Sequence, residues 1–556
     1  MLAAGAAAAA VPAGDPLAQA EAALARGDGI AAEAAVNRAL EAGLPRNEAA
    51  ALAGEAELLQ GELSEARRWL GPGDFAPRTR QRGFHALARL AMAEGDLAAA
   101  TRAFDRALAS GQGSAALWVD IGRMRYRAGQ HHLALAAAAR AIELDPNEPL
   151  ALEFTAQLTR DAVGVVAALP WFERAVERAP GDVDLLGEYA ATLGEAGRNA
   201  DMLRVVRRMV ELEPRHPRAY YLQAVLAARA GLDDLATRLL ARTQGAYDHM
   251  PAGQMLAGIL ELKAGNAALA IDHFDRLVRR QPDNPGAALL LGRALLAHGE
   301  GNEVVARFAP AAQRADAPPY LLTLVGRAYE QLGRRREAAG YLDRAAREWH
   351  TAIGVLPLTG SDSEVPRLRR LLAERRNGEA RALIAQLARR HPGSVDVEIV
   401  GGDVALLTGD PGRALATYRR AAQVRRDFAL VERMVAAQRL LGRDDAAMAQ
   451  IAGYLAQNPR SAAASALLGR MLAERGDWPR ASALLGHANR LRAGDVRLLA
   501  DLAATELALG DIPAARATAG RAHALQRANG RVATLLAHID RAGDGDGQAA
   551  RALARR

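Results

Sequence analysis

The chain of 556 residues lacks cysteine and has a single lysine, Lys263, among its 71 basic residues. The absence of cysteine excludes disulfide bonds, thiolate nucleophiles and cysteine-ligated zinc. Lys263 follows Leu262 and not glycine, so a phosphate-binding P-loop is excluded too. Aromatic residues make up only 4%, which argues against a thick conventional core. No run approaches eighteen apolar residues, so no membrane-spanning helix is predicted.

The residues that are abundant favour helix. Half of the chain is hydrophobic, alanine dominates that half, and leucine and arginine are also frequent. The formal net charge of +7 is small for this length and does not predict nucleic acid binding. Arginine and acidic residues alternate along most segments, which is typical of solvated helix faces. The composition therefore predicts an all-α protein.

A repeating pattern is clearest between Ala115 and Glu148. With Ala115 as position 1, apolar or small residues stand at positions 4, 7, 8, 20, 24 and 27, glycine at 15 and proline at 32. Steps of 34 residues keep this frame from residue 13 to 352, and only Val163 breaks the glycine series. The glycines at position 15 are Gly27, Gly61, Gly95, Gly129, Gly197, Gly231, Gly265, Gly299 and Gly333.

The frame shifts after His350 and then continues to residue 529, with repeats that start near Ser361 and at Val395, Phe428, Ala462 and Val496. The predicted organisation is an alanine-rich leader at 1–12, repeats 1–10 at 13–352, an insertion or elbow at 353–360, repeats 11–15 at 361–529, a capping helix at 530–543 and a flexible tail at 544–556.

Each preferred residue type in the repeat pattern has a physical reason. Apolar residues at positions 4, 7, 11 and 24 give two helices a buried stripe, and small residues at 8, 20 and 27 let their backbones approach closely. Glycine at 15 takes the left-handed conformation that ends the first helix, and proline at 32 ends the second. Asp15 followed by Pro16 predicts a helix start.

This pattern resembles the tetratricopeptide repeat family. The resemblance implies a right-handed α-solenoid of about fifteen helix-turn-helix repeats with a C-terminal capping helix. It also implies that positions 2, 5, 6, 9, 12 and 13 of each first helix face a concave groove that binds other molecules. The candidate groove contacts are therefore Arg82, Arg89, Arg123, Tyr126, Arg127, Phe154, Tyr221, Arg229, Arg293, Tyr320 and Arg327.

Two interpretations of the groove are open. Arginines at position 9 of successive repeats suit carboxylates, phosphates or an acidic polysaccharide, because each guanidinium group binds an anion through two hydrogen bonds. Acidic residues interrupt the arginines, however, so the alternative is a mixed, solvated groove with internal ion pairs. Some family members grip a C-terminal carboxylate with lysine and asparagine, but position 9 has no asparagine here, so that clamp is not supported.

A dense basic patch follows the insertion, with Arg367, Arg369, Arg370, Arg375 and Arg376. It would suit an acidic partner or a membrane surface, or else form the solvated face of an irregular repeat. No catalytic motif and no metal or cofactor site is predicted: His131 and His132 are adjacent and point to different helix faces, and the acidic residues of the tail lack the rest of a calcium loop.

The leader MLAAGAAAAAVP resembles the end of a secretory signal peptide, although a positively charged start is missing. This favours a periplasmic or envelope location, and a disordered start of a cytoplasmic protein is the alternative. The sequence thus predicts a non-enzymatic scaffold for protein or peptide partners, by analogy in envelope assembly or in exopolysaccharide or protein secretion. There are two other hypotheses. The chain binds an acidic polysaccharide or other polyanion directly, or it is the regulatory subunit of a separate enzyme.

Overall fold

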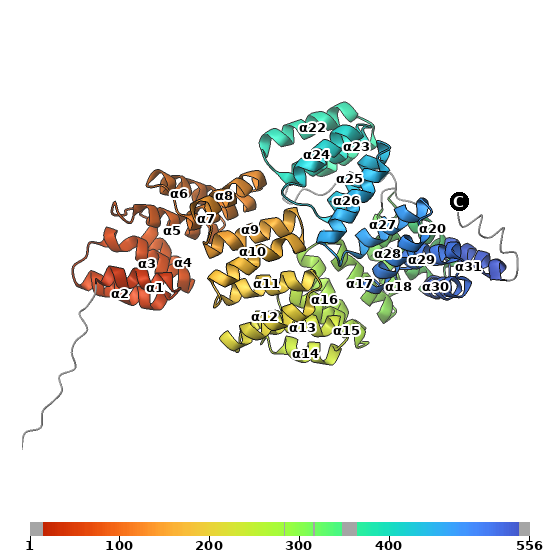
Figure 1. The fold of residues 1–556 in the computed structure, drawn as a ribbon, viewed down its shortest axis with the longest axis horizontal. Coiled ribbons are helices and arrows are strands. Elements are labelled where there is room, and N and C mark those ends of the chain that lie inside the picture. Colours follow the sequence, from red (N-terminus) through yellow and green to blue (C-terminus); the bar gives the residue numbers. More distant parts are fainter. Residues whose placement is uncertain (1–14, 283, 315–316, 347–363, 544–556) are drawn as a thin grey trace, which may run out of the picture. The chain divides into compact units, whose positions relative to one another are not determined.

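The structure is a computed structural model that describes residues 15–282, 284–314, 317–346 and 364–543. Within these residues all regular structure is α-helical, in 31 helices (Figure 1). Fourteen pairs of consecutive helices pack together as hairpins, α9 and α10 stand between the fourth and the fifth of these pairs in chain order, and α31 follows the last. The predicted all-α repeat fold is confirmed, whereas the leader, the insertion at 353–360 and the tail lie outside the described residues.

The chain divides into two compact units, residues 1–155 with 391–394, and residues 156–390 with 395–556. The first unit is built from helices that each pack against the next along the chain. Its helices are α1 (Pro16–Ala25), α2 (Gly29–Glu41), α3 (Arg46–Gln60), α4 (Leu63–Leu70), α5 (Arg80–Ala93), α6 (Leu97–Ala109), α7 (Ala115–Arg127) and α8 (His131–Leu144), and α9 (Pro149–Ala162) begins in it.

The second unit continues the same hairpin pattern. Its helices are α10 (Val165–Arg178), α11 (Val183–Glu195), α12 (Asn199–Leu212), α13 (Pro217–Arg229), α14 (Asp233–Ala241), α15 (Pro251–Lys263), α16 (Ala267–Arg280), α17 (Pro285–His298), α18 (Gly301–Ala312), α19 (Pro319–Gln331), α20 (Arg335–Ala346), α21 (Glu364–Ala373), α22 (Asn377–Arg390), α23 (Val395–Leu407), α24 (Pro411–Ala421), α25 (Phe428–Leu440), α26 (Asp444–Gln457), α27 (Ala462–Glu474), α28 (Trp478–Leu491), α29 (Val496–Leu509), α30 (Ile512–Leu525) and α31 (Gly530–Gly543).

The helix boundaries follow the repeat frame. Seven successive first helices, from α7 to α19, begin 34 residues apart. Position 1 of the later repeats is also a helix start, at α23, α25, α27 and α29. Helix α1 begins as predicted, because the Asp15 side chain accepts a hydrogen bond from the Leu17 amide and Pro16 occupies the first turn.

Small residues at position 8 let the helices approach closely. A Cβ atom on Gly122 would lie 2.5 Å from a ring carbon of Phe154, and one on Gly402 would lie 2.3 Å from the ring of Tyr418. Neither distance is possible for a real side chain unless its neighbour moves. The requirement for a small residue at this position is therefore steric, as the pattern predicts.

The turn glycines adopt the expected left-handed backbone, for example with φ of +74° at Gly129. The exception at Val163 has a structural consequence within the second unit. Here Gly164 takes the positive φ in its place, and the loop contacts the start of α25. The Arg426 amide donates to the Asp161 carbonyl at 2.8 Å, and its guanidinium group donates to the Val163 carbonyl at 2.8 Å. The break in the repeat thus coincides with a long-range contact.

A second long-range contact lies at the end of the array. Helix α31 packs against α20, and the Ala528 amide donates a hydrogen bond of 2.6 Å to Glu330 Oε1. The C-terminal repeats of the second unit therefore contact repeat 10 directly, in addition to their neighbours along the chain.

The turn at position 15 of repeat 11 has no glycine, unlike most of the other repeats, and the effect of this difference can be tested. Arg375 occupies it with φ +57°, a conformation that costs an L-residue about 1–2 kcal/mol. We expect Arg375→Gly to raise the free energy of unfolding by about 0.5–1 kcal/mol in urea titrations, after the extra freedom of glycine in the unfolded chain is counted. The reverse change at an open turn, Gly333→Arg, should lower it by about as much. A loss of stability in Arg375→Gly would contradict this account.

Candidate functional site

The predicted groove arginines of the first unit are engaged in ion pairs. Arg82 Nε lies 2.6 Å from Glu55 Oε2. The guanidinium group of Arg89 lies between two carboxylates, 3.8 Å from Glu55 and 3.9 Å from Asp120. These side chains come from the first helices α3, α5 and α7, so the pairs run across the groove face from one repeat to the next.

The series continues on α7 and α9. Arg123 lies 3.7 Å from Asp120 and 3.5 Å from Glu153. His85 Nε2 lies 2.8 Å from Asp120 Oδ2. Burial alone would raise the pKa of Asp120, but the contact with His85 and the charges of Arg89 and Arg123 outweigh burial and lower that pKa. This groove therefore holds a series of alternating charges that largely cancel, which we call the ion-pair ladder (Glu55, Arg89, Asp120, Arg123, Glu153).

The other candidates of the first unit differ in exposure. Phe154 is only 4% exposed and packs against Gly122, so it is a core residue and not a groove contact. Tyr126 packs edge-on against His131, with ring centroids 4.9 Å apart. Arg127 is exposed.

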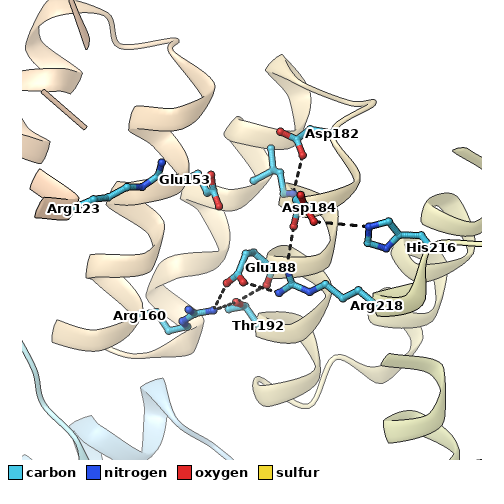
Figure 2. Close-up of polar contacts among 10 residues, drawn as sticks. Arg123, Glu153, Arg160, Asp182, Asp184, Glu188, Thr192, His216 and Arg218 are labelled. Atoms are coloured by element: carbon cyan, nitrogen blue, oxygen red, sulfur yellow. Dashed lines mark hydrogen bonds and ion pairs between the residues drawn. The ribbon is translucent and has the colours of Figure 1, made fainter. Parts of the chain in front are cut away.

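A similar charge arrangement recurs in the second unit, where Figure 2 shows Glu188 between two arginines. Arg218 Nη2 lies 2.6 Å from Glu188 Oε1, and Arg160 Nη1 lies 3.2 Å from its Oε2 and 3.1 Å from Thr192 Oγ1. Burial opposes ionisation of Glu188, but its hydrogen bond and charge contact with Arg218, together with Arg160, lower its pKa. Position 6 thus carries the central acid here, as Asp120 does in the first unit.

Three further groove positions of the second unit are also occupied by contacts within the chain. Tyr221 stacks on Tyr247 with ring centroids 4.3 Å apart. Arg229 Nη1 donates to the Gly194 carbonyl at 2.9 Å. Lys263 Nζ lies 2.8 Å from Asp233. Each of these three side chains therefore has a contact partner within the chain.

The predicted basic patch is partly neutralised by acids on the same repeat. Arg367 lies 3.4 Å from Glu364, and Arg376 lies 3.1 Å from Glu374 and 2.7 Å from Glu379. This arrangement is typical of a solvated helix face. Arg370 and Arg375 are exposed. The side chain of Arg369 lies outside the described residues.

The remaining candidates, Arg293, Tyr320 and Arg327, line a cavity of about 690 Å³ in the second unit. One wall is formed mainly by the first helices of repeats 9 and 10, α17 and α19, and the other by α25, α27, α29 and the start of α31. A smaller adjoining volume of about 380 Å³ shares Arg293 and Arg327. Within the described part of the chain, neither guanidinium group has an ion-pair or hydrogen-bond partner, and both side chains are exposed.

The opposite wall of this cavity adds more arginines than acids. Arg470 and Arg531 share one carboxylate, Asp501, at 3.2 and 3.4 Å. The buried Nε of Arg497 has no hydrogen-bond partner among the described residues, and burial, aided by the nearby Arg470, lowers the pKa of Arg497. Glu432 also lines the cavity, where loss of solvation raises its pKa although neighbouring arginines oppose the rise.

Four residues of this cavity were not predicted from the sequence, namely Glu432, Arg470, Arg497 and Arg531. The signal was present for three of them, because Glu432 stands at position 5, Arg470 at position 9 and Arg497 at position 2 of repeats 13 to 15. What could not be read from the spacing is that these positions face Arg293 and Arg327 across one cavity.

The described ranges contain neither a candidate metal site nor a candidate membrane-spanning helix. No group of three or more histidine, aspartate or glutamate side chains there is arranged to hold a metal ion. None of the described helices has the length and apolar character that crossing a membrane requires.

Comparison with known proteins identifies the repeats. One family model described as a tetratricopeptide repeat matches residues 85–149, 119–183 and 367–428, and another matches residues 261–327. No curated protein sequence matches the chain.

Three solved structures resemble this chain with low TM-scores. The Cut9-Hcn1 hetero-tetramer of the APC/C is 14% identical with a TM-score of 0.35, over 94% of this chain and 95% of that chain. A human IFIT1 dimer is 18% identical with a TM-score of 0.39, over 69% and 92%. The type IV pilus biogenesis factor PilW is 19% identical with a TM-score of 0.31, over 35% and 94%. Nothing about the ligands of this chain follows from these likenesses. The family matches, together with the helical hairpins that recur along the described residues, show that the chain is a protein that contains tetratricopeptide repeats.

Proposed function

We propose that the chain is a non-enzymatic scaffold that binds protein partners along the first-helix faces of its repeats. Tetratricopeptide repeats support a role in protein interaction, since stacked hairpins present an extended, regular surface. The ion-pair ladder of the first unit is the observation that carries the proposal for this chain. Its charges alternate and are mutually paired, so the surface is polar but close to neutral.

Such a surface suits a folded or extended protein better than a polyanion. A polyanion would have to displace Glu55, Asp120 and Glu153 from their arginines and would meet those carboxylates at close range. A protein partner carries both charge signs and can add to the series without breaking it. An acidic polysaccharide is therefore a less suitable ligand for the first unit than a protein.

The place of action that we propose is the cell envelope, in assembly or in secretion. The support is the alanine-rich leader, which resembles the end of an exported protein's signal peptide. Fractionation of source cells, with detection by an antibody, tests this part alone: recovery in the periplasmic or envelope fraction is expected, and recovery only in the cytoplasm would contradict it.

A capture experiment tests the scaffold. The purified chain is immobilised, exposed to envelope and soluble fractions of its source, and washed at low and high salt. We expect defined proteins to be retained at both salt concentrations, and retention to fall at least tenfold with Arg89→Glu plus Arg123→Glu, which turn the ladder into a run of like charge.

The matched control is Arg102→Glu plus Arg140→Glu, which makes the same charge change on exposed second-helix positions of neighbouring repeats. Circular dichroism melts must show that both variants stay folded. Equal retention by the ladder variant and the wild type would overturn the proposed surface. Recovery of acidic polymer alone, and only at low salt, would replace the scaffold with the polyanion hypothesis.

A further inference from the structure

The cavity of the second unit differs from the ion-pair ladder because its cations are in excess. Six arginines line it, and only two acidic residues do. The six are Arg293, Arg327, Arg470, Arg492, Arg497 and Arg531, and the acids are Glu432 and Asp495. Three of the six already compete for carboxylates, since Arg470 and Arg531 share Asp501 and Arg492 lies 4.0 Å from Asp495.

The other three arginines supply donors that the described residues leave unused. Arg293 and Arg327 have no partner there, and Arg497 has a buried Nε without an acceptor. A guanidinium group has five N–H donors, and several such groups around one cavity repel one another unless an anion lies between them. These arginines come from both walls, so one anionic molecule within the cavity could contact all three at once.

The size and the remaining lining limit the kind of anion. A volume of about 690 Å³ lies in the range of sites for small organic molecules. Apolar side chains alternate with the arginines, among them Leu289, Leu296, Tyr320 and Phe428. Inorganic ions would leave this apolar surface uncovered, and a long polymer would not fit in such a volume.

We propose that this cavity binds a small organic anion with two or more acidic groups, held by Arg293 and Arg327 from one wall and Arg497 from the other. The acidic groups, carboxylate or phosphate, accept paired hydrogen bonds from the guanidinium groups. The rest of the ligand lies against the apolar side chains. Because the two walls belong to repeats 9–10 and 13–15, the ligand links two stretches of the array that the sequence separates.

The site shares no residue with the ion-pair ladder, on which the test of the scaffold rests, so either proposal can fail alone. The test measures thermal unfolding and isothermal titration calorimetry of the full chain with citrate, a tricarboxylate, and with pyrophosphate, which carries the phosphate groups of such a ligand without its apolar part. Sodium chloride at matched ionic strength is the reference, because salt alone alters exposed ion pairs. We expect one-to-one binding of at least one anion and a higher melting temperature than in the reference.

Variants locate the binding. Arg293→Gln plus Arg327→Gln removes two unpaired charges and should weaken binding at least tenfold. The melting temperature without ligand should stay the same or rise, because the repulsion among the remaining arginines falls. Arg207→Gln plus Arg238→Gln makes the same charge change on exposed second-helix positions and should leave binding intact. A preference for citrate assigns a carboxylate ligand and a preference for pyrophosphate a phosphate ligand. No effect beyond sodium chloride, or equal losses in both double variants, would overturn the proposal.

Discussion

The substitution Gly258→Leu is expected to destabilise the protein by about 3 kcal/mol or more, the upper range for overpacking a filled core. Gly258 stands at position 8 of repeat 8, on α15, against the second helix α16. A Cβ atom there would lie 2.6 Å from Cε1 and 2.8 Å from Cζ of Phe274, a ring that is fully buried. Because the ring is fully buried, we expect the added side chain to push the two helices apart.

Two controls make this result specific. Gly340→Leu places the same side chain on an exposed helical position with no atom within 4 Å, and it should raise stability by about 0.5–1 kcal/mol because leucine has the higher helix propensity. Arg293→Ala, on the groove side, should also leave the fold intact. Urea unfolding followed by circular dichroism measures all three. The repeat frame would be in error if Arg293→Ala proved more damaging than Gly258→Leu.

The substitution Arg433→Met is expected to cost about 3–5 kcal/mol, because it leaves a charge buried without its counter-ion. Asp403 is fully buried on α23, and Arg433 on α25 has only 9% of its side chain exposed. Arg433 Nε donates to Asp403 Oδ1 at 2.9 Å, and the Tyr418 hydroxyl donates to the same oxygen at 2.6 Å. Burial and the adjacent Asp403 raise the pKa of Tyr418, so its hydroxyl stays protonated and donates over the ordinary pH range.

The double variant Asp403→Asn plus Arg433→Met separates a charge effect from a packing effect. The asparagine oxygen can still accept from Tyr418, and no ion remains uncompensated, so the double variant should be more stable than Arg433→Met alone. Thermal and urea unfolding of the wild type, both single variants and the double variant complete the cycle. Additive losses would show that Arg433 acts through packing alone.

Much of the fold could be predicted because its determinants are local. A glycine at position 15 or a proline at position 32 acts on its own turn, and a small residue at position 8 acts on the next helix. The helix starts at Ala115 and Pro149, and the left-handed turn at Gly129, therefore follow from sequence spacing. The place of the exception could be predicted, because Val163 breaks the glycine series. Only the structure shows that the neighbouring Gly164 has a positive φ of 138° there, as the N-cap of α10.

The candidate site was predicted less well. The position of a residue within the repeat indicates on which face its side chain lies, but not which other residues it contacts. Arg89 and Arg293 both stand at position 9, and the spacing treats them alike. Arg89 lies between Glu55 and Asp120, whereas Arg293 faces a cavity without a partner among the described residues. Their difference depends on neighbours from other repeats.

The sequence by itself thus determined the repeat, its period and its boundaries, since short-range steric and backbone preferences repeat every 34 residues and need no distant partner. Tertiary structure alone decided which arginines are neutralised and which remain free to bind. Contacts between α20 and α31, and between the loop before α10 and the start of α25, lie far apart in the chain and obey no period. Charge pairing across such contacts depends on distances of a few ångströms, which the order of residues does not specify.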